Sequence, residues 1–327
     1  MATIFKVLIL LCTFEAILGS LQLFVRGPFL WISFQNLEGI GRASGLNGTL
    51  TFGANMLISS VLLIPFLFKE KRQTIYLLKY QKFCFCILLF GVLITVTRSQ
   101  WIAVSIAFLT YYLMFNQQRS LFHKLLQFFP IVVLLITLII MLYIIPGSFL
   151  LGFEYRIFSV LDDPSALSRI SLSYAGLMMF LDNPIWGVGI GHFIELYWDY
   201  FPAFMNQEEV TSAMMPHNLM IALGAECGIF VVIVYYSFYI WSMKNFFKRI
   251  KNPYTSPIDK KIYQGLFLYV IAFFFDSLFH NYFTENLIWI VFALSFYPYA
   301  YPEKSSHASV ITSSKSLTVI NPLPSDA

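Results

Sequence analysis

The sequence predicts an all-α fold, a polytopic bundle of about eight transmembrane helices with a large, partly helical loop outside the cytoplasm. Hydrophobic residues make up 58% of the 327 residues and charged residues only 12%, whereas a soluble domain is about half apolar and a quarter charged. Apolar runs of the roughly 20 residues that a helix needs to cross a bilayer recur along the chain. Together these observations exclude a water-soluble fold.

Eight segments have the length and apolarity of a spanning helix. In chain order they are residues 3–25, 50–68, 83–99, 100–116, 126–151, 217–242, 262–280 and 285–301. The first could be a signal peptide, because Lys6 precedes its apolar stretch. However, Glu15 interrupts that stretch and no convincing cleavage site follows, so we expect it to remain as a span.

Basic residues set the orientation. Lysines and arginines cluster after the second, fourth and sixth spans, and the positive-inside rule places these connectors and both termini in the cytoplasm. The outer side carries arginine but no lysine, which indicates positions that need a planar, forked cation. These arginines are Arg26, Arg42, Arg98, Arg156 and Arg169.

The predicted organisation is a membrane-embedded domain, residues 1–301, followed by a tail, residues 302–327. The outer loop at residues 152–216 is too polar for lipid and too long for a simple link. Its apolar periodicity predicts an ordered lid with at least one amphipathic helix. The tail is rich in Ser, Thr and Pro, so we expect it to be disordered and cytoplasmic.

Two outer arginines are candidates for chemistry. Arg98 lies at the outer end of the third span, where a guanidinium is costly unless it is paired or faces a wet cavity. The alternative is an interfacial anchor whose charge reaches the headgroups. Arg169 opens a helical stretch that Pro184 and the glycines of residues 187–191 end in a turn. A solvated helix position is the alternative for Arg169.

The spacing of Gly187, Gly189 and Gly191 superficially resembles a dinucleotide-binding fingerprint. That fingerprint requires a preceding strand, whereas these glycines follow a predicted helix. We therefore expect a flexible turn that allows close backbone approach.

His217-Asn218 precedes the sixth apolar run. An imidazole at the membrane boundary can accept a proton near neutral pH, as a general base must, although a lone His before a helix is more often a cap or surface residue. His280-Asn281 is a rival pair, next to Asp276 and Glu285.

We predict neither a metal nor a cofactor. Asp162-Asp163-Pro164 has the composition of a turn, and no His or Cys cluster has the spacing of metal ligands. The sequence contains no P-loop, nucleophile elbow or HExxH motif. ATP-driven, serine-hydrolase and zincin functions therefore lack support, and we expect no nucleic-acid partner.

Four stretches stand out along the chain: Arg42-Ala43-Ser44-Gly45, Thr97-Arg98-Ser99, the stretch from Arg169 through Phe193 with its Asp182-Asn183-Pro184 core, and His217-Asn218-Leu219 followed by Glu226-Cys227-Gly228. Taken together, these segments resemble the O-antigen ligase and polymerase superfamily of membrane glycosyltransferases. Two residues depart from common superfamily patterns, Val231 and Ile102. Members generally have several more spans before the segment that begins here, so we expect an N-terminally shortened member.

The resemblance implies metal-independent, inverting transfer of a glycan from an undecaprenyl-diphosphate-linked donor to an acceptor hydroxyl, outside a bacterial inner membrane. The acceptor could be lipid A core, as in lipopolysaccharide biosynthesis, another glycan or a protein; membrane lipids are the other partners. The loop at residues 152–216 would be the catalytic loop. The implied catalytic residues are His217, Arg169 and Arg98, and the implied substrate-binding residues are Arg156, Arg42, Asn218 and His192.

Two other functions remain open, a transporter of a small anion such as bicarbonate and an inactive structural partner in glycan export. A transporter places its binding groups near the midplane on broken helices. Here the polar candidates lie at the outer ends of spans and in the outer loop, which favours the enzyme.

Overall fold

The computed structural model describes residues 1–22, 35–37, 40–42, 46, 49–68, 75–95, 97–115, 164–205, 213–281 and 286–297. The chain divides into two units, Met1–Phe296 and Tyr297–Ala327. The predicted span at residues 126–151 and the predicted tail at residues 302–327 lie outside the described residues.

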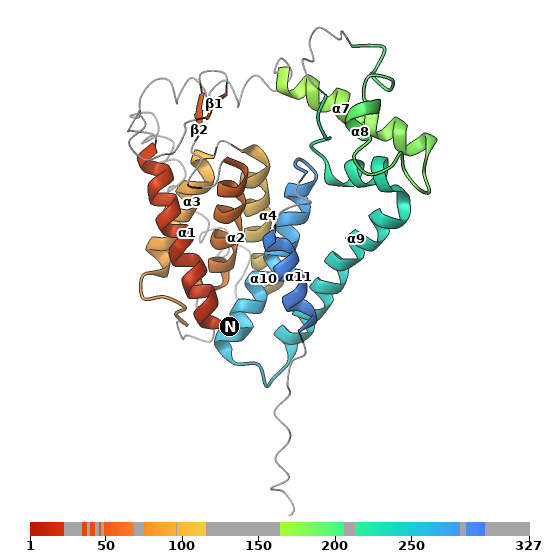
Figure 1. Cartoon of the computed structure of the whole chain (residues 1–327). Coiled ribbons are helices and arrows are strands. Elements are labelled where there is room, and N and C mark those ends of the chain that lie inside the picture. Colours follow the sequence, from red (N-terminus) through yellow and green to blue (C-terminus); the bar gives the residue numbers. More distant parts are fainter. Residues whose placement is uncertain are drawn as a thin grey trace, which may run out of the picture. The chain divides into compact units, whose positions relative to one another are not determined.

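The described regular structure is helical apart from one short hairpin (Figure 1), so the predicted helical class is confirmed. In the hairpin, β1 (Gln35–Leu37) pairs antiparallel with β2 (Ile40–Arg42). Strands of three residues are too short to show the alternation by which strands are recognised. The helices are α1 (Ala2–Gln22), α2 (Thr49–Leu67), α3 (Gln81–Ile94), α4 (Arg98–Phe115), α7 (Pro164–Asp182), α8 (Phe193–Leu196), α9 (Leu219–Lys251), α10 (Pro257–Ser277) and α11 (Asn286–Phe296).

Within the described ranges, each predicted span coincides with a helix to within about five residues, except at α9. By length and composition alone, α1 and α9 could cross a membrane, while residues 51–67, α3 and α11 are shorter apolar helices. The count of eight spans therefore stays a prediction.

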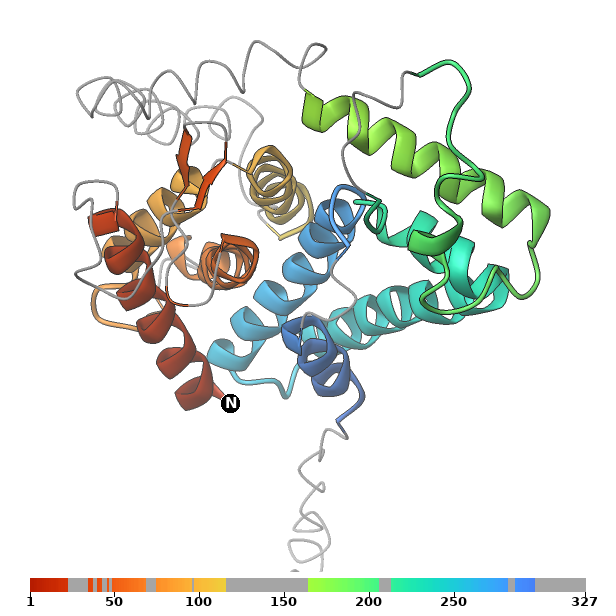
Figure 2. The same ribbon diagram turned by 45° about the horizontal axis from the view of Figure 1, so that its top comes forward.

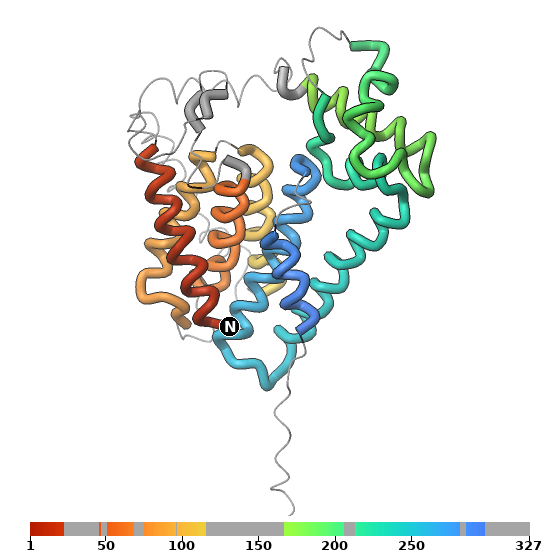
Figure 3. Tube along the Cα trace, viewed as in Figure 1, coloured from red at the N-terminus to blue at the C-terminus, as the bar shows by residue number. Residues whose placement is uncertain are grey.

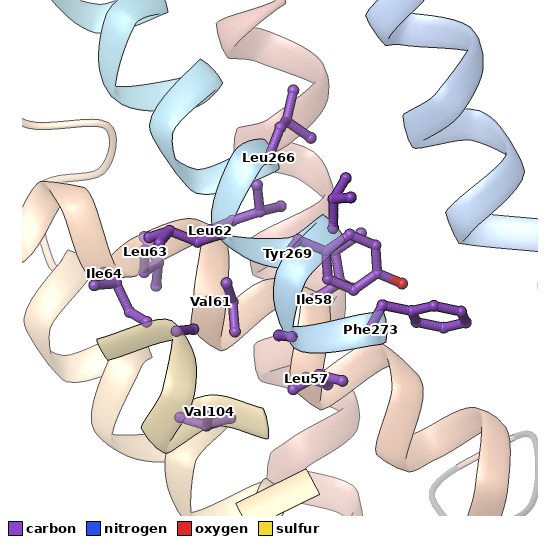
Figure 4. Close-up of a cluster of buried hydrophobic side chains, with 14 of the residues drawn as sticks. Leu57, Ile58, Val61, Leu62, Leu63, Ile64, Val104, Leu266, Tyr269 and Phe273 are labelled. Atoms are coloured by element: carbon purple, nitrogen blue, oxygen red, sulfur yellow. The ribbon is translucent and has the colours of Figure 1, made fainter. Parts of the chain in front are cut away.

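The core of the bundle surrounds α10, which packs against α2, α4, α9 and α11 (Figure 2). A Cβ at Gly265 would lie 3.0 Å from the Cα of Leu62, so the backbones of α10 and α2 approach closely, as small residues at helix crossings allow. Figure 4 shows the cluster that fills this junction, with Leu57, Ile58, Val61, Leu62, Leu63 and Ile64 of α2, Val104 of α4, and Leu266, Tyr269 and Phe273 of α10.

Basic side chains cap the C-terminal ends of α2 and α11 at one end of the bundle. The Nζ of Lys261 donates to the carbonyls of Pro65 (2.8 Å) and Phe68 (2.7 Å) at the end of α2. The guanidinium of Arg249 donates to the carbonyls of Leu294 and Ser295, both at 2.9 Å, at the end of α11. Cations suit helix C-termini because they satisfy carbonyls and oppose the negative end of the dipole. The connection from α9 to α10 lies at the same end as the N-terminus (Figures 1 and 3).

Candidate functional site

A break in α9 shapes the site. Gly228 has φ 76° and ψ −177°, a conformation that is essentially restricted to glycine. It divides α9 into residues 219–227 and residues 229–251. The predicted span at 217–242 is therefore corrected: its first part is a separate arm, and the continuous helix begins at Ile229.

The loop after α7 forms hydrogen bonds with the backbone groups that this break leaves without helical partners. Val188 N–H donates to the Ala225 carbonyl (2.8 Å) and Gly189 N–H to the Glu226 carbonyl (3.0 Å). Ile229 N–H donates to the Pro184 carbonyl (2.9 Å). A helix end leaves such groups without intrahelical partners, and the loop replaces those partners.

Close approach explains the glycines of this joint. A Cβ at Gly187 would collide with the backbone of Glu226 and Cys227, and a Cβ at Gly228 would collide with the Ile185 carbonyl. Gly187 also has positive φ. The predicted close-approach turn is therefore present.

Glu226 fastens the same loop, a role that sequence reasoning did not assign to it. Its Oε1 accepts from Gly191 N–H (3.0 Å) and Phe193 N–H (3.3 Å). The signal in the sequence was a carboxylate inside an apolar run, which is costly unless it is paired.

The amphipathic helix predicted in the loop is present as α7, and it packs on the first part of α9. A Cβ at Gly176 would lie 2.6 Å from Cγ2 of Ile221, so the α7 backbone lies directly against the Ile221 side chain. Ser171 Oγ and Tyr197 Oη share a hydrogen bond of 2.7 Å. The small core between them contains Leu172, Ala175, Met179, Phe193, Tyr197 and Ala225.

Asn218 ties the start of α9 to the end of α10. Its Oδ1 accepts from Ile221 N–H (3.0 Å), which makes it the N-cap of α9. Its Nδ2 donates to the Leu278 carbonyl (3.0 Å), at the C-cap of α10. The half-buried His217 is consequently held beside the end of α10.

His217 lies within electrostatic reach of residues from two other elements. Burial, the positive charge of Arg169 on α7 and the nearby His280 together lower the pKa of His217 to about 4. Each of these disfavours the charged imidazolium. His217 is therefore neutral at pH 7 and retains a nitrogen lone pair that can accept a proton.

His280 connects this group to the start of α4. Its Nδ1 lies 3.1 Å from Ser99 Oγ and 3.3 Å from Oδ1 of the buried Asp276. Both contacts fall on one ring nitrogen, whereas a Ser-His-Asp triad uses both nitrogens. The arrangement therefore orients the His280 ring rather than activating Ser99 as a nucleophile.

Ser99 follows Arg98, whose predicted position needs a correction. Arg98 begins α4 and does not end the preceding helix, because α3 stops at Ile94. Thr97 accounts for the boundary, since its carbonyl accepts from the N–H groups of Gln100 and Trp101 and so starts the new helix.

The structure thus brings His217 within electrostatic reach of Arg169 and His280. The adjacent Asn218 contacts the end of α10, and Arg98 precedes Ser99, which contacts His280. His192 is exposed just before α8, with its ring beside Gly189. Among the remaining predicted site residues, Arg42 ends β2 and Arg156 lies outside the described residues.

The described part of the chain holds no group of three or more His, Cys, Asp and Glu placed to bind a metal ion. The predicted site residues near the start of α9 are instead a guanidinium, an amide and a neutral imidazole, with a second arginine at the first residue of α4. Guanidiniums bind phosphate-like anions through paired, charge-assisted hydrogen bonds. The chemistry of this end of the bundle therefore suits an anionic ligand and a proton transfer.

Comparison with known proteins finds one family model. Residues 83–236 match the family model described as O-antigen ligase, a segment that includes Arg98, Arg169, His217 and the break at Gly228. A search of curated proteins finds no match. Over residues 83–236 the chain is therefore similar to the O-antigen ligase family, which supports the resemblance to the O-antigen ligase and polymerase superfamily.

Proposed function

We propose that the protein transfers a glycan from an undecaprenyl-diphosphate-linked donor to an acceptor hydroxyl, without a metal and with inversion at C1, on the extracytoplasmic side of the inner membrane. The observation that carries the proposal is the link between three elements at this end of the bundle: Asn218, next to His217, contacts the Leu278 carbonyl (3.0 Å), and His280 contacts Ser99, next to Arg98 (3.1 Å). Arg169 of α7 lies within electrostatic reach of His217. In this topology both termini are cytoplasmic and α7 lies outside, with the lysine-bearing helix ends on the cytoplasmic side.

The donor diphosphate would bind between Arg98 and Arg169. Arg98 occupies the first residue of α4, where the helix already presents N–H groups and the positive end of its dipole. A cation at that position is unfavourable for the helix alone, and an anion removes the conflict. Arg169 would approach the diphosphate from α7, so each guanidinium could form a bidentate pair.

The transfer is a single displacement. The acceptor oxygen forms a bond to C1 of the donor sugar while the bond from C1 to the diphosphate oxygen breaks, and its electron pair leaves with the lipid diphosphate. The acceptor proton passes to His217, and attack opposite the leaving group inverts C1. General-base assistance of this kind contributes about a hundredfold to ten-thousandfold, and the arginines stabilise charge that grows on the leaving group.

The donor itself would adjust the basicity of His217. Burial and the positive charge of Arg169 hold the pKa of His217 at about 4. A diphosphate bound to Arg169 offsets that positive charge, so the pKa of His217 rises toward its ordinary value of about 6.5. His217 therefore becomes an effective proton acceptor when the donor is in place.

The break in α9 would also fit the transporter alternative, because broken helices bind ions in transporters. Here the Ala225 and Glu226 carbonyls accept hydrogen bonds from Val188 and Gly189, and the Ile229 N–H donates to Pro184. The groups released by the break hold the loop in place, which favours the enzyme.

The test is single-turnover transfer from purified lipid-linked donor in proteoliposomes, with donor binding measured separately. Arg98→Lys and Arg169→Lys keep the charge but lose the fork, so each should slow transfer by roughly a hundredfold to a thousandfold and weaken binding less. Arg249→Lys is the matched control at the opposite end of the bundle and should keep near-normal rates. Near-normal turnover in both site variants would refute the proposal.

The acceptor can be identified from the glycans of a strain that lacks the protein. Unligated polymer indicates lipid A core as the acceptor. Single unpolymerised repeats indicate another glycan, and an unglycosylated protein indicates protein transfer.

A further inference from the structure

An apolar surface covers the outward side of α7 and the segment after it. Ile170, Leu177 and Leu181 are exposed on α7 at helical spacing, on the side away from the small core described above. Beyond the helix, Trp186 and Ile190 are both 81% exposed. Contiguous apolar patches on a soluble surface mark interaction sites. We define this patch by Leu177, Leu181, Ile185, Trp186 and Ile190 and treat it as a candidate interaction site.

The patch adjoins the exposed face of a candidate membrane span. Pro184 accepts the hydrogen bond from Ile229, the first residue of the continuous part of α9, and Gly228 touches the Ile185 carbonyl. Below this joint the exposed face of α9 is apolar as well; its members include Phe230, Ile233, Val234, Ile240 and Trp241. The patch therefore continues the exposed apolar face of this candidate span.

The length of this helix indicates the depth of the patch. Residues 229–243 precede the first cation, Lys244, and 15 residues at about 1.5 Å each rise roughly 22 Å. A hydrocarbon core is about 30 Å thick. The span is thus too short by itself, and Ile185, Trp186 and Ile190 lie where the missing apolar length is needed.

Charge decides between two ways of binding a membrane surface. Residues 170–205 contain no Lys or Arg, while Asp182, Glu195 and Asp199 are acidic. Attraction to anionic headgroups is therefore excluded as the driving force. The remaining driving force is the burial of apolar side chains. Trp is enriched at the boundary between headgroups and acyl chains.

We infer that the end of α7 and the loop after it dock into the outer leaflet of the bilayer, with Trp186 and Ile190 inserted among headgroups and upper acyl chains. The lid that carries Arg169 then rests on the membrane at the depth of lipid headgroups. This interaction is independent of which sugar or acceptor the enzyme uses, and a failure of glycan transfer leaves it unaffected.

The experiment uses the full chain in phosphatidylcholine nanodiscs, one copy per disc, with Cys12, Cys84, Cys86 and Cys227 replaced by alanine. Trp186→Cys and Ile190→Cys carry nitroxide labels, and Glu195→Cys is the matched control on an exposed acidic position of the same segment. Collision rates with oxygen, which partitions into lipid, and with a water-soluble nickel chelate are compared. The oxygen-to-nickel ratio at 186 and 190 should exceed that at 195 by about tenfold, and added phosphatidylglycerol should leave it unchanged.

Equal nickel access at all three positions would overturn the inference. Protection that appears only after undecaprenyl phosphate is added would overturn it in favour of a donor-chain groove. Protection that appears only with two copies per disc, together with spin–spin broadening, would assign the surface to a second copy of the chain. Two labelled positions keep the test valid if one substitution disturbs the loop.

Discussion

Gly228→Ala should release the loop after α7 from α9. The new Cβ would collide with the Ile185 carbonyl, and φ of 76° is strained by about 1–3 kcal/mol for a residue with a side chain. Relief of the collision moves the loop away and breaks the three hydrogen bonds made by Val188, Gly189 and Ile229, each of which contributes about 1 kcal/mol. The joint should therefore lose about 4–6 kcal/mol.

Gly191→Ala is the matched control. Gly191 also has positive φ, at 85°, but a Cβ there would meet nothing within 4 Å. The substitution therefore adds strain of about 1–3 kcal/mol without a collision, and the hydrogen bonds of the joint should remain.

The assay is amide hydrogen exchange of the peptide that contains Val188 and Gly189, in nanodiscs. In Gly228→Ala this peptide should exchange faster than in Gly191→Ala by on the order of a hundredfold, because a difference of about 3 kcal/mol corresponds to that factor. Peptides of α10 should be unchanged in both variants and report an intact bundle. Equal protection in the two variants would refute the account of the joint.

Three further predictions concern the site and the topology. The acid limb of kcat/KM should lie near pH 4 rather than 6.5, because His217 must be neutral and its pKa in the free enzyme is about 4. Arg169→Gln removes a positive charge and should move that limb to higher pH. An unchanged limb would show that Arg169 does not lower the pKa of His217. His217→Ala should abolish transfer at normal membrane levels and His280→Ala should have the smaller effect, with the reverse ranking moving the active site to the end of α10. In a cysteine-free variant of intact spheroplasts, an impermeant maleimide should label a cysteine at position 195 and not one at position 254, and the opposite pattern would invert the topology.

The sequence predicted most helix boundaries because their signals are local. Pro184 and the following glycines placed the end of α7, which stops at Asp182. The break at Gly228 was missed because glycine is common inside transmembrane helices, so an apolar run that contains one glycine still has the pattern of a single span. Glu226 was the only local sign of the joint, and its partners, Gly191 and Phe193, lie far back in the sequence.

The gathering of the site residues depends on contacts that no local pattern encodes. Ser99 and His280 are 181 positions apart and share a contact of 3.1 Å. Asn218 reaches the end of α10 through the Leu278 carbonyl. Patterns at His217 and Arg169 could indicate chemistry at each residue, but only helix packing determines that the two lie within electrostatic reach.

The joint at Gly228 allows the two parts of α9 to point in different directions, which a continuous helix would not. Residues 229–251 follow the direction of the span, whereas residues 219–227 turn toward α10, where Asn218 holds the helix start beside Leu278. His217 and the lid are thus positioned by one joint, while Arg98 begins α4, which packs against α10 within the bundle. Loosening the joint should therefore displace the proton acceptor and Arg169 but leave Arg98 in place. Gly228→Ala should then slow single-turnover transfer more than Arg98→Lys does, because it misplaces both the proposed proton acceptor and one of the two arginines proposed to bind the diphosphate.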